Sequence, residues 1–183
     1  MPKTILWQWK LIQLTTERVG DGDAAYDCEI ARRSPGVRVI CEQNGRILLS
    51  KEFRREHDEV DLRLPGGKVF DSLGEFLTFT GDLESAALDA AVREMLEECW
   101  LHIENLELFH VSHCGTSIDW DLYYFSTSQF SQGERIIHPG EEGITYEWYT
   151  YDEVFNLLVD GHQIKEDRTV GVLFTFLARK NFF

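Results

Sequence analysis

The sequence predicts an α/β fold in which strands and helices mix around a sheet. Several short runs rich in β-branched and apolar residues alternate with a period of two, and a long stretch after them repeats its apolar residues with a helical period. A chain of 183 residues with 43% hydrophobic content can bury a sizeable core without disulfides or metals. We therefore expect one globular domain over residues 1–183.

Seven runs have the pattern of strands. They are expected at residues 5–14, 26–32, 37–41, 46–51, 106–112, 120–126 and 144–149. The polar segment 20–23 is the expected turn of a first hairpin. Asn44-Gly45, the strongest short hairpin signal, is the expected turn of a second.

The first convincing helix covers residues 84–99. Its apolar stripe consists of Leu88, Val92, Met95 and Cys99. This stripe should pack on the sheet, while Glu94 and Glu98 lie off it. Two further helices are expected at about residues 152–159 and 167–179.

Composition excludes several classes of function. The formal net charge of −14 disfavours a nucleic-acid duplex or an anionic membrane as partner, because phosphate contacts need clustered lysine and arginine. No apolar run approaches the length of a membrane span, and no secretory leader opens the chain. The four scattered cysteines form no CxxC pair, which is typical of reduced thiols in a cytoplasmic protein.

Residues 93–98, with the sequence Arg-Glu-Met-Leu-Glu-Glu, place three carboxylates and one guanidinium on barely two helical turns. Glu94 and Glu98 project from the same face, and Glu97 lies on its flank. Like charges at this spacing repel by about 0.2–0.5 kcal/mol per pair, and a divalent cation would turn that repulsion into binding. A solvated acidic face is the alternative for so short a motif.

Together with Pro65-Gly66-Gly67, this segment resembles the Nudix hydrolase box, a loop, helix and loop that binds metal and diphosphate. Gly67 matches the opening glycine, and residues 93–101 match the closing half. The resemblance implies the Nudix fold, a mixed β-sheet sandwiched between helices. It also implies an N-terminal β-hairpin extension over residues 1–34 and a catalytic core over 35–183.

Three features depart from the family pattern. About a dozen extra residues, roughly 70–82, stand between the box glycine and the box helix, and their apolar content predicts that they pack on the protein. A place beside the active site is expected, because both ends of the segment are fixed there. Ser85 replaces the expected glutamate, with Asp82 or Glu84 as possible substitutes. Trp100 replaces the final glycine and cannot adopt a left-handed cap as cheaply.

A narrower resemblance covers most of the chain and is to the ADP-ribose pyrophosphatase and nucleoside-diphosphate-sugar branch of the superfamily. It is carried by four segments in order, residues 47–54, 62–67, 148–153 and 161–169, the last with Asp167 and Thr169 as matches. The implied activity is hydrolysis of the diphosphate linkage in a small nucleoside diphosphate derivative, such as ADP-ribose or a sugar nucleotide. A homodimer is implied too, because the N-terminal strands of this branch help to build the partner's pocket.

The resemblance assigns roles to the box residues. Glu94 and Glu98 would bind Mg²⁺, or Mn²⁺ in its place, and the carbonyl of Gly66 would add an oxygen. Mg²⁺ suits such a site because it prefers a few carboxylates together with waters and substrate phosphate. Glu97 would bind a second ion or hold Arg93, and Arg93 would orient the glutamates.

The catalytic base and the substrate contacts are expected outside the box. Glu141 and Glu142 are the candidates for the base, because glycines on both sides would let their loop close over substrate, although a solvated acidic loop has the same pattern. Arg54 and Arg55 would hold the terminal phosphate, since guanidinium forks match phosphate oxygens.

Two other functions stay open. Ser85 and Trp100 are compatible with a Nudix-fold nucleotide-binding or regulatory module that has weak or no turnover. A nucleoside triphosphate pyrophosphohydrolase is the other alternative, although its compact members usually lack so long an N-terminal strand region. The exact substrate is also open, because residues 112–115 lack the proline of the branch's Ser-Pro-Gly.

Overall fold

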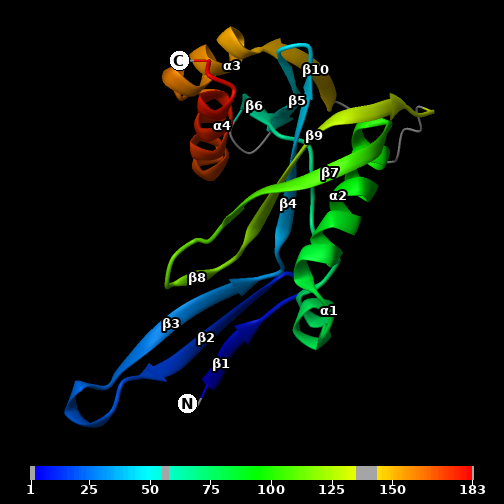
Figure 1. Ribbon diagram of the computed structural model, residues 1–183. Coiled ribbons are helices and arrows are strands. Elements are labelled where there is room, and N and C mark those ends of the chain that lie inside the picture. Colours follow the sequence, from blue (N-terminus) through cyan, green and yellow to red (C-terminus); the bar gives the residue numbers. More distant parts are fainter. Residues whose placement is uncertain (1–2, 55–57, 135–143, 183) are drawn as a thin grey trace.

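The computed structural model describes residues 3–54, 58–134 and 144–182, and arranges them as two sheets and four α-helices (Figure 1). The strands are β1 Lys3–Gln8, β2 Ile12–Val19, β3 Tyr26–Arg33, β4 Gly36–Gln43, β5 Arg46–Arg54, β6 Glu59–Arg63, β7 Leu101–Ser112, β8 Ile118–Asp119, β9 Leu122–Gln132 and β10 Thr145–Thr150. The helices are α1 Leu73–Thr78, α2 Leu83–Cys99, α3 Tyr151–Asp160 and α4 Asp167–Arg179, with a short 3-10 turn at Gly22–Ala24. No helix in the described ranges is long and apolar enough to cross a membrane.

The N-terminal sheet has the strand order β1-β2-β3-β8 and extends away from the main body (Figure 1). The prediction of one strand over residues 5–14 is wrong, because the chain turns between Gln8 and Ile12, where the N–H of Trp9 donates to the carbonyl of Ile12 at 2.9 Å. This turn contains no glycine or proline, and the alternation of apolar residues continues across it, so no sequence signal marked it. The predicted turn at 20–23 is present and joins β2 to β3.

The main sheet is mixed, as predicted. Its order is β10-β5-β4-β9-β7, with β6 also paired to β5; β4 and β9 are parallel, and the other pairs are antiparallel. The predicted Asn44-Gly45 hairpin joins β4 to β5, and both turn residues have positive φ, 52° and 73°. Such a turn matches the right-handed twist of its flanking strands.

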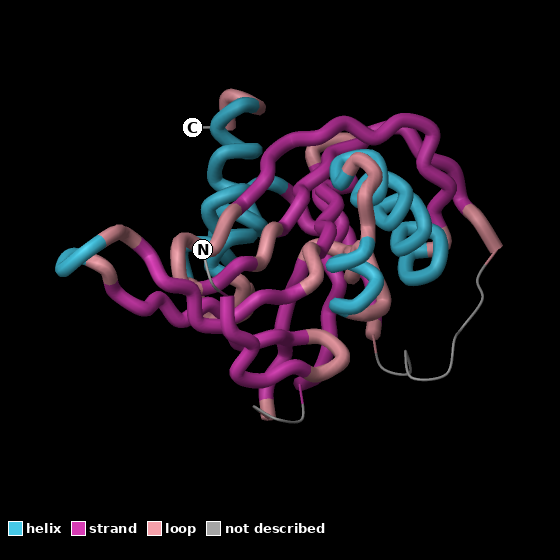
Figure 2. Tube along the Cα trace, turned by 90° about the horizontal axis from the view of Figure 1, so that it is seen from below, coloured by secondary structure: helices cyan, strands magenta, loops and turns pink. Residues whose placement is uncertain are grey.

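Helices cover both faces of the main sheet (Figures 1 and 2). One apolar cluster lies under α2, and another lies under α3 and α4. All three predicted helices after residue 83 are confirmed within two residues at each end. The predicted apolar stripe of α2 is buried at only part of its positions. Met95 and Cys99 are buried, but Val92 is 37% exposed, and the rest of the buried face consists of Ala87, Ala90 and Ala91.

The inserted segment forms α1 and packs, as its apolar content predicted. Leu73 is fully buried, and its N–H donates to the carbonyl of Lys10 at 2.8 Å. Phe70 contacts Phe79 with ring centroids 4.9 Å apart. The segment therefore joins the box region to the turn between β1 and β2, although Leu77 remains 44% exposed.

Candidate functional site

The Pro65-Gly66-Gly67 segment is held along the edge of β4. The N–H groups of Val39 and Val37 donate to the carbonyls of Pro65 and Gly67, both at 2.9 Å. Gly66 has a φ of 142°, and a Cβ there would lie 2.2 Å from the Val37 carbonyl oxygen. Both its backbone conformation and its close approach to β4 therefore require glycine.

Glu94 and Glu98 of α2 meet this segment, as the box resemblance implied. A Cβ on Gly67 would lie 2.4 Å from the carboxylate of Glu94, so the missing side chain makes room for that carboxylate. The N–H of Gly66 donates to Oε2 of Glu98 at 3.2 Å. Two carboxylates one helical turn apart thus converge on two successive glycines.

Arg93 ties the helix to the same loop. Its Nη2 donates to the carbonyl of Lys68 at 3.2 Å and to Oε1 of Glu94 at 3.3 Å, and its Nε lies 4.0 Å from Oε2 of Glu97. The guanidinium therefore lies against both glutamates and fixes the position of Glu94. The side chain of Glu97 is 47% exposed, against 15% for Glu94.

The electrostatic state of Glu94 fits a cation site. Burial raises the pKa of Glu94, and the nearby Glu97 carboxylate adds to the rise, while Arg93 only partly offsets it. A carboxylate whose charged form is destabilised by burial gains from an added positive charge. Within the described ranges, no three His, Cys, Asp or Glu side chains are grouped closely enough to hold a metal ion between them.

Other predicted site residues are not located. Glu141, Glu142 and Arg55 lie outside the described residues. The backbone of Arg54 ends β5, but its side chain also lies outside the described set.

The two box departures have structural explanations. Asp82 is the N-cap of α2: its Oδ2 accepts the N–H of Ser85 at 2.9 Å and its hydroxyl at 2.6 Å, and these bonds lower the pKa of Asp82. Asp82 thus caps the helix through one of its oxygens, and the substitution of Asp82 or Glu84 for the missing glutamate stays a prediction. Trp100 has φ 55° and ψ 37°, so it does adopt the left-handed cap usually left to glycine, and its ring packs edge-on against Tyr146.

A buried polar network that no sequence pattern predicted begins at Arg38, whose backbone adjoins Gly66. Arg38 of β4 makes a bidentate ion pair with Glu166, at 3.0 and 2.9 Å, and Thr169 donates to the same carboxylate. Burial would raise the pKa of Glu166, but Arg38 and Thr169 outweigh it and lower the pKa. Glu166 is separated from Thr169 by the two residues that the C-terminal motif has, whereas the predicted match, Asp167, is separated from it by one.

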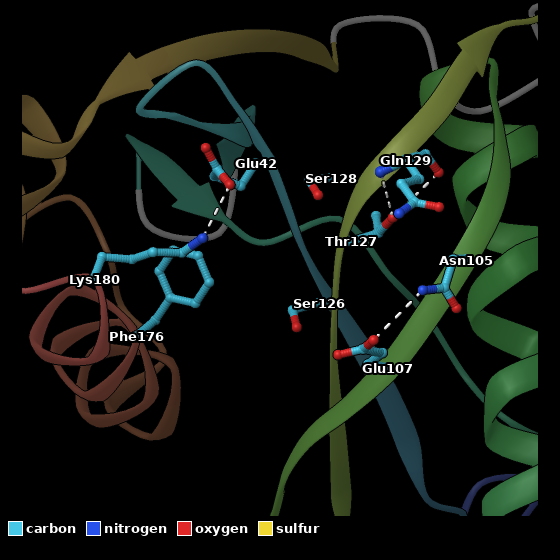
Figure 3. Close-up of a pocket in the computed structure, with 9 residues that line it drawn as sticks. All are labelled: Glu42, Asn105, Glu107, Ser126, Thr127, Ser128, Gln129, Phe176 and Lys180. Atoms are coloured by element: carbon cyan, nitrogen blue, oxygen red, sulfur yellow. Dashed lines mark hydrogen bonds and ion pairs between the residues drawn. The ribbon is translucent and has the colours of Figure 1, made fainter.

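A polar cavity of about 180 Å³ lies elsewhere, between β7, β9 and the end of α4 (Figure 3). Glu42 and Lys180 form an ion pair of 3.1 Å at its edge, and Asn105 points toward Glu107. None of the box residues lines this cavity. It is therefore distinct from the site built on Glu94 and Glu98.

Known proteins resemble the chain in family and fold. The family model described as NUDIX domain matches residues 31–169. The crystal structure of ADP compounds hydrolase superposes with a TM-score of 0.71 over 98% of this chain and 94% of that one, at 12% identity. A phosphoglycerate kinase of Staphylococcus saprophyticus is 27% identical over 90 residues, which span 46% of this chain but only 23% of that protein. The family match covers the glycine segment, β4, the box helix and the buried network described above, and the chain belongs to the Nudix family.

Proposed function

We propose that this Nudix hydrolase cleaves the diphosphate linkage of a small nucleoside diphosphate derivative, such as ADP-ribose or a sugar nucleotide, and that it depends on Mg²⁺. The observation that carries the proposal is the convergence of Glu94 and Glu98 on Gly66-Gly67. The name of the ADP compounds hydrolase, which shares the fold, is consistent with this substrate class.

The residues at this place fit Mg²⁺, or Mn²⁺ in its stead. Glu94 and Glu98 supply two carboxylates, which suits an ion that keeps most of its waters and binds substrate phosphate better than a closed protein cage. The N–H of Gly66 already faces Glu98, and the carbonyls of its two neighbours, Pro65 and Gly67, are bound by β4. The carbonyl of Gly66 is proposed as the additional oxygen ligand. When bound, Mg²⁺ supplies positive charge that neutralises the diphosphate oxygens.

Other side chains would position the metal ligands and activate the attacking water. Arg93 holds Glu94 in place through the Lys68 carbonyl, so we assign it a positioning role. Glu97, half-exposed beside Arg93, is assigned to a second ion or to that guanidinium. Glu141 or Glu142 is proposed to take the proton from the attacking water.

Substrate contacts and assembly are part of the same proposal. Arg54 and Arg55 would bind the terminal phosphate. The N-terminal sheet carries exposed apolar side chains, among them Trp7 at 52% and Trp9 at 71%, which supports a homodimer in which this sheet is covered. The free thiols of Cys28, Cys41, Cys99 and Cys114 support a cytoplasmic location.

A panel of nucleotides tests this function. Purified protein would be incubated with ADP-ribose, sugar nucleotides and nucleoside triphosphates, with Mg²⁺ or with EDTA, and the phosphomonoester products measured after phosphatase treatment. Mg²⁺-dependent turnover of ADP-ribose or sugar nucleotides is expected, with little turnover of triphosphates. Preferred release of pyrophosphate from triphosphates would contradict the proposed substrate class.

One observation favours a second candidate, a nucleotide-binding module with weak turnover. Ser85 stands in place of the box glutamate, and Asp82 is occupied in capping α2. Nucleotide binding by calorimetry without turnover of any panel member, in the presence of Mg²⁺, would favour this candidate over the enzyme.

A further inference from the structure

A second groove runs between α4 and β7 and encloses about 200 Å³. Arg168 and Arg179 mark its two ends on one stripe of α4, with Thr175 between them, and Phe109 and Ser112 line it from β7. Eleven helical residues span about 16 Å. The groove is therefore elongated and has one guanidinium at each end.

These two arginines lack carboxylate partners within the described part of the chain, and no residue that lines the groove carries a carboxylate. That is unusual in a sequence with 32 acidic and 18 basic residues. Two acidic residues directly precede Arg168 in sequence. Glu166 is bound by Arg38 and Thr169, and Asp167 does not line the groove. The groove thus stays positive in a strongly negative protein.

Aromatic stacking holds both guanidinium groups in place. Arg168 lies 4.2 Å from the ring centroid of Trp120, and Arg179 lies 4.4 Å from that of Phe109. Stacking covers the face of a guanidinium but leaves its N–H edge for planar anionic groups.

Arg168 also has unused hydrogen-bonding capacity. Its Nη1 donates to the carbonyls of Trp120 at 2.9 Å and Ser112 at 3.4 Å, whereas its buried Nη2 has no hydrogen-bond partner among the residues that the structure describes. Arg33 stacks on Trp120 as well, and burial together with the charges of Arg38 and Arg168 lowers the pKa of Arg33. An anionic acceptor bound at Arg168 would therefore accept a hydrogen bond from its buried Nη2 and would reduce the repulsion between Arg168 and the nearby Arg33.

We propose that the groove between α4 and β7 binds an elongated small molecule that carries an anionic group, phosphate or carboxylate, at each end. This site is separate from the Nudix box. The box segment lies along β4, and β9 stands between β4 and β7, which places the groove roughly 14 Å away across the sheet. Its apolar wall, Phe109 and Val172, belongs to the cluster under α3 and α4, not to the cluster under α2.

The test is calorimetric titration of the full chain in Mg²⁺-free buffer. The probes are hexanediol bisphosphate and suberate, with hexyl phosphate carrying one anionic group and hexanediol carrying none. The variants are Arg179→Gln and, as a matched control, Lys180→Gln, which makes the same charge change one residue away. Lys180 pairs with Glu42 beside the other cavity (Figure 3). Both side chains are exposed at the helix end, so neither change should unfold the protein.

We expect at least one dianion to bind, hexyl phosphate to bind about tenfold more weakly, and hexanediol not to bind. Arg179→Gln should weaken dianion binding about tenfold, and Lys180→Gln by less than twofold. A Glu94→Gln, Glu98→Gln double variant should bind the dianion as the unaltered protein does. Binding of neither dianion, equal losses in the two charge variants, or loss in the box variant would each overturn the proposal.

Discussion

Replacement of Gly67 by alanine tests how closely Glu94 depends on the glycine segment. The added Cβ would lie 2.4 Å from the Glu94 carboxylate, whereas ordinary contacts begin at 3.4 Å, so the carboxylate must move by about 1 Å. A displacement of this size at a catalytic group costs on the order of 10²-fold in rate. We therefore expect Gly67→Ala to lower kcat/KM for the best substrate of the panel about a hundredfold.

The fold should tolerate this change. The atoms in the way are the end of a flexible side chain, and Gly67 does not have positive φ, so the unfolding temperature should change by only a few degrees. Gly74→Ala is the control, because its nearest new contact is 3.8 Å away on Ser72. Phosphomonoester products, measured after phosphatase treatment at a series of Mg²⁺ concentrations, give the rates. Unchanged activity in Gly67→Ala would refute the assignment of Glu94 to the site.

Three further predictions follow from the same geometry. Because the pKa of Glu94 is raised in the folded state, folded protein binds more protons than unfolded protein just above pH 4.5. The free energy of unfolding of the metal-free protein should therefore fall as the pH rises through that window. Urea unfolding at several pH values should show that this fall is absent in Glu94→Gln. Replacement of residues 71–81 by a Gly-Ser linker removes the hydrogen bond between Leu73 and Lys10. It should change the order of kcat/KM among ADP-ribose and sugar nucleotides more than it changes the dependence on Mg²⁺. An unchanged order would mean that the segment is a packing element only. Deletion of the residues before Pro35 should yield a monomer with raised KM, and a monomeric full-length protein in sedimentation would contradict the proposed dimer.

Much of the main sheet could be predicted because its signals are local. Asn44-Gly45 specifies a tight hairpin, and the apolar period of residues 84–99 specifies a helix. The turn after Gln8 could not be predicted, since no breaker residue marks it and the alternation of apolar residues runs across it.

The same contrast holds at the site. The spacing of Glu94 and Glu98 predicted a shared face, and the structure places both at Gly66-Gly67. The pairing of Arg38 with Glu166 joins residues 128 positions apart, which no local pattern encodes. Likewise, the face of α2 that packs on the sheet contains alanines and not Val92. Which residues contact the sheet depends on how closely and at what angle the helix approaches it, and the sequence period does not give this.

Glu98→Gln tests most directly whether the box helix forms a metal-dependent catalytic site. Glutamine keeps the size of Glu98 and can still accept the Gly66 N–H, but it loses the charge. With Mg²⁺ limiting, turnover of the preferred substrate should fall by at least about a hundredfold, while metal-free thermal unfolding stays nearly unchanged. Turnover equal to that of the unaltered protein under these conditions would contradict the assignment of this helix as the metal site.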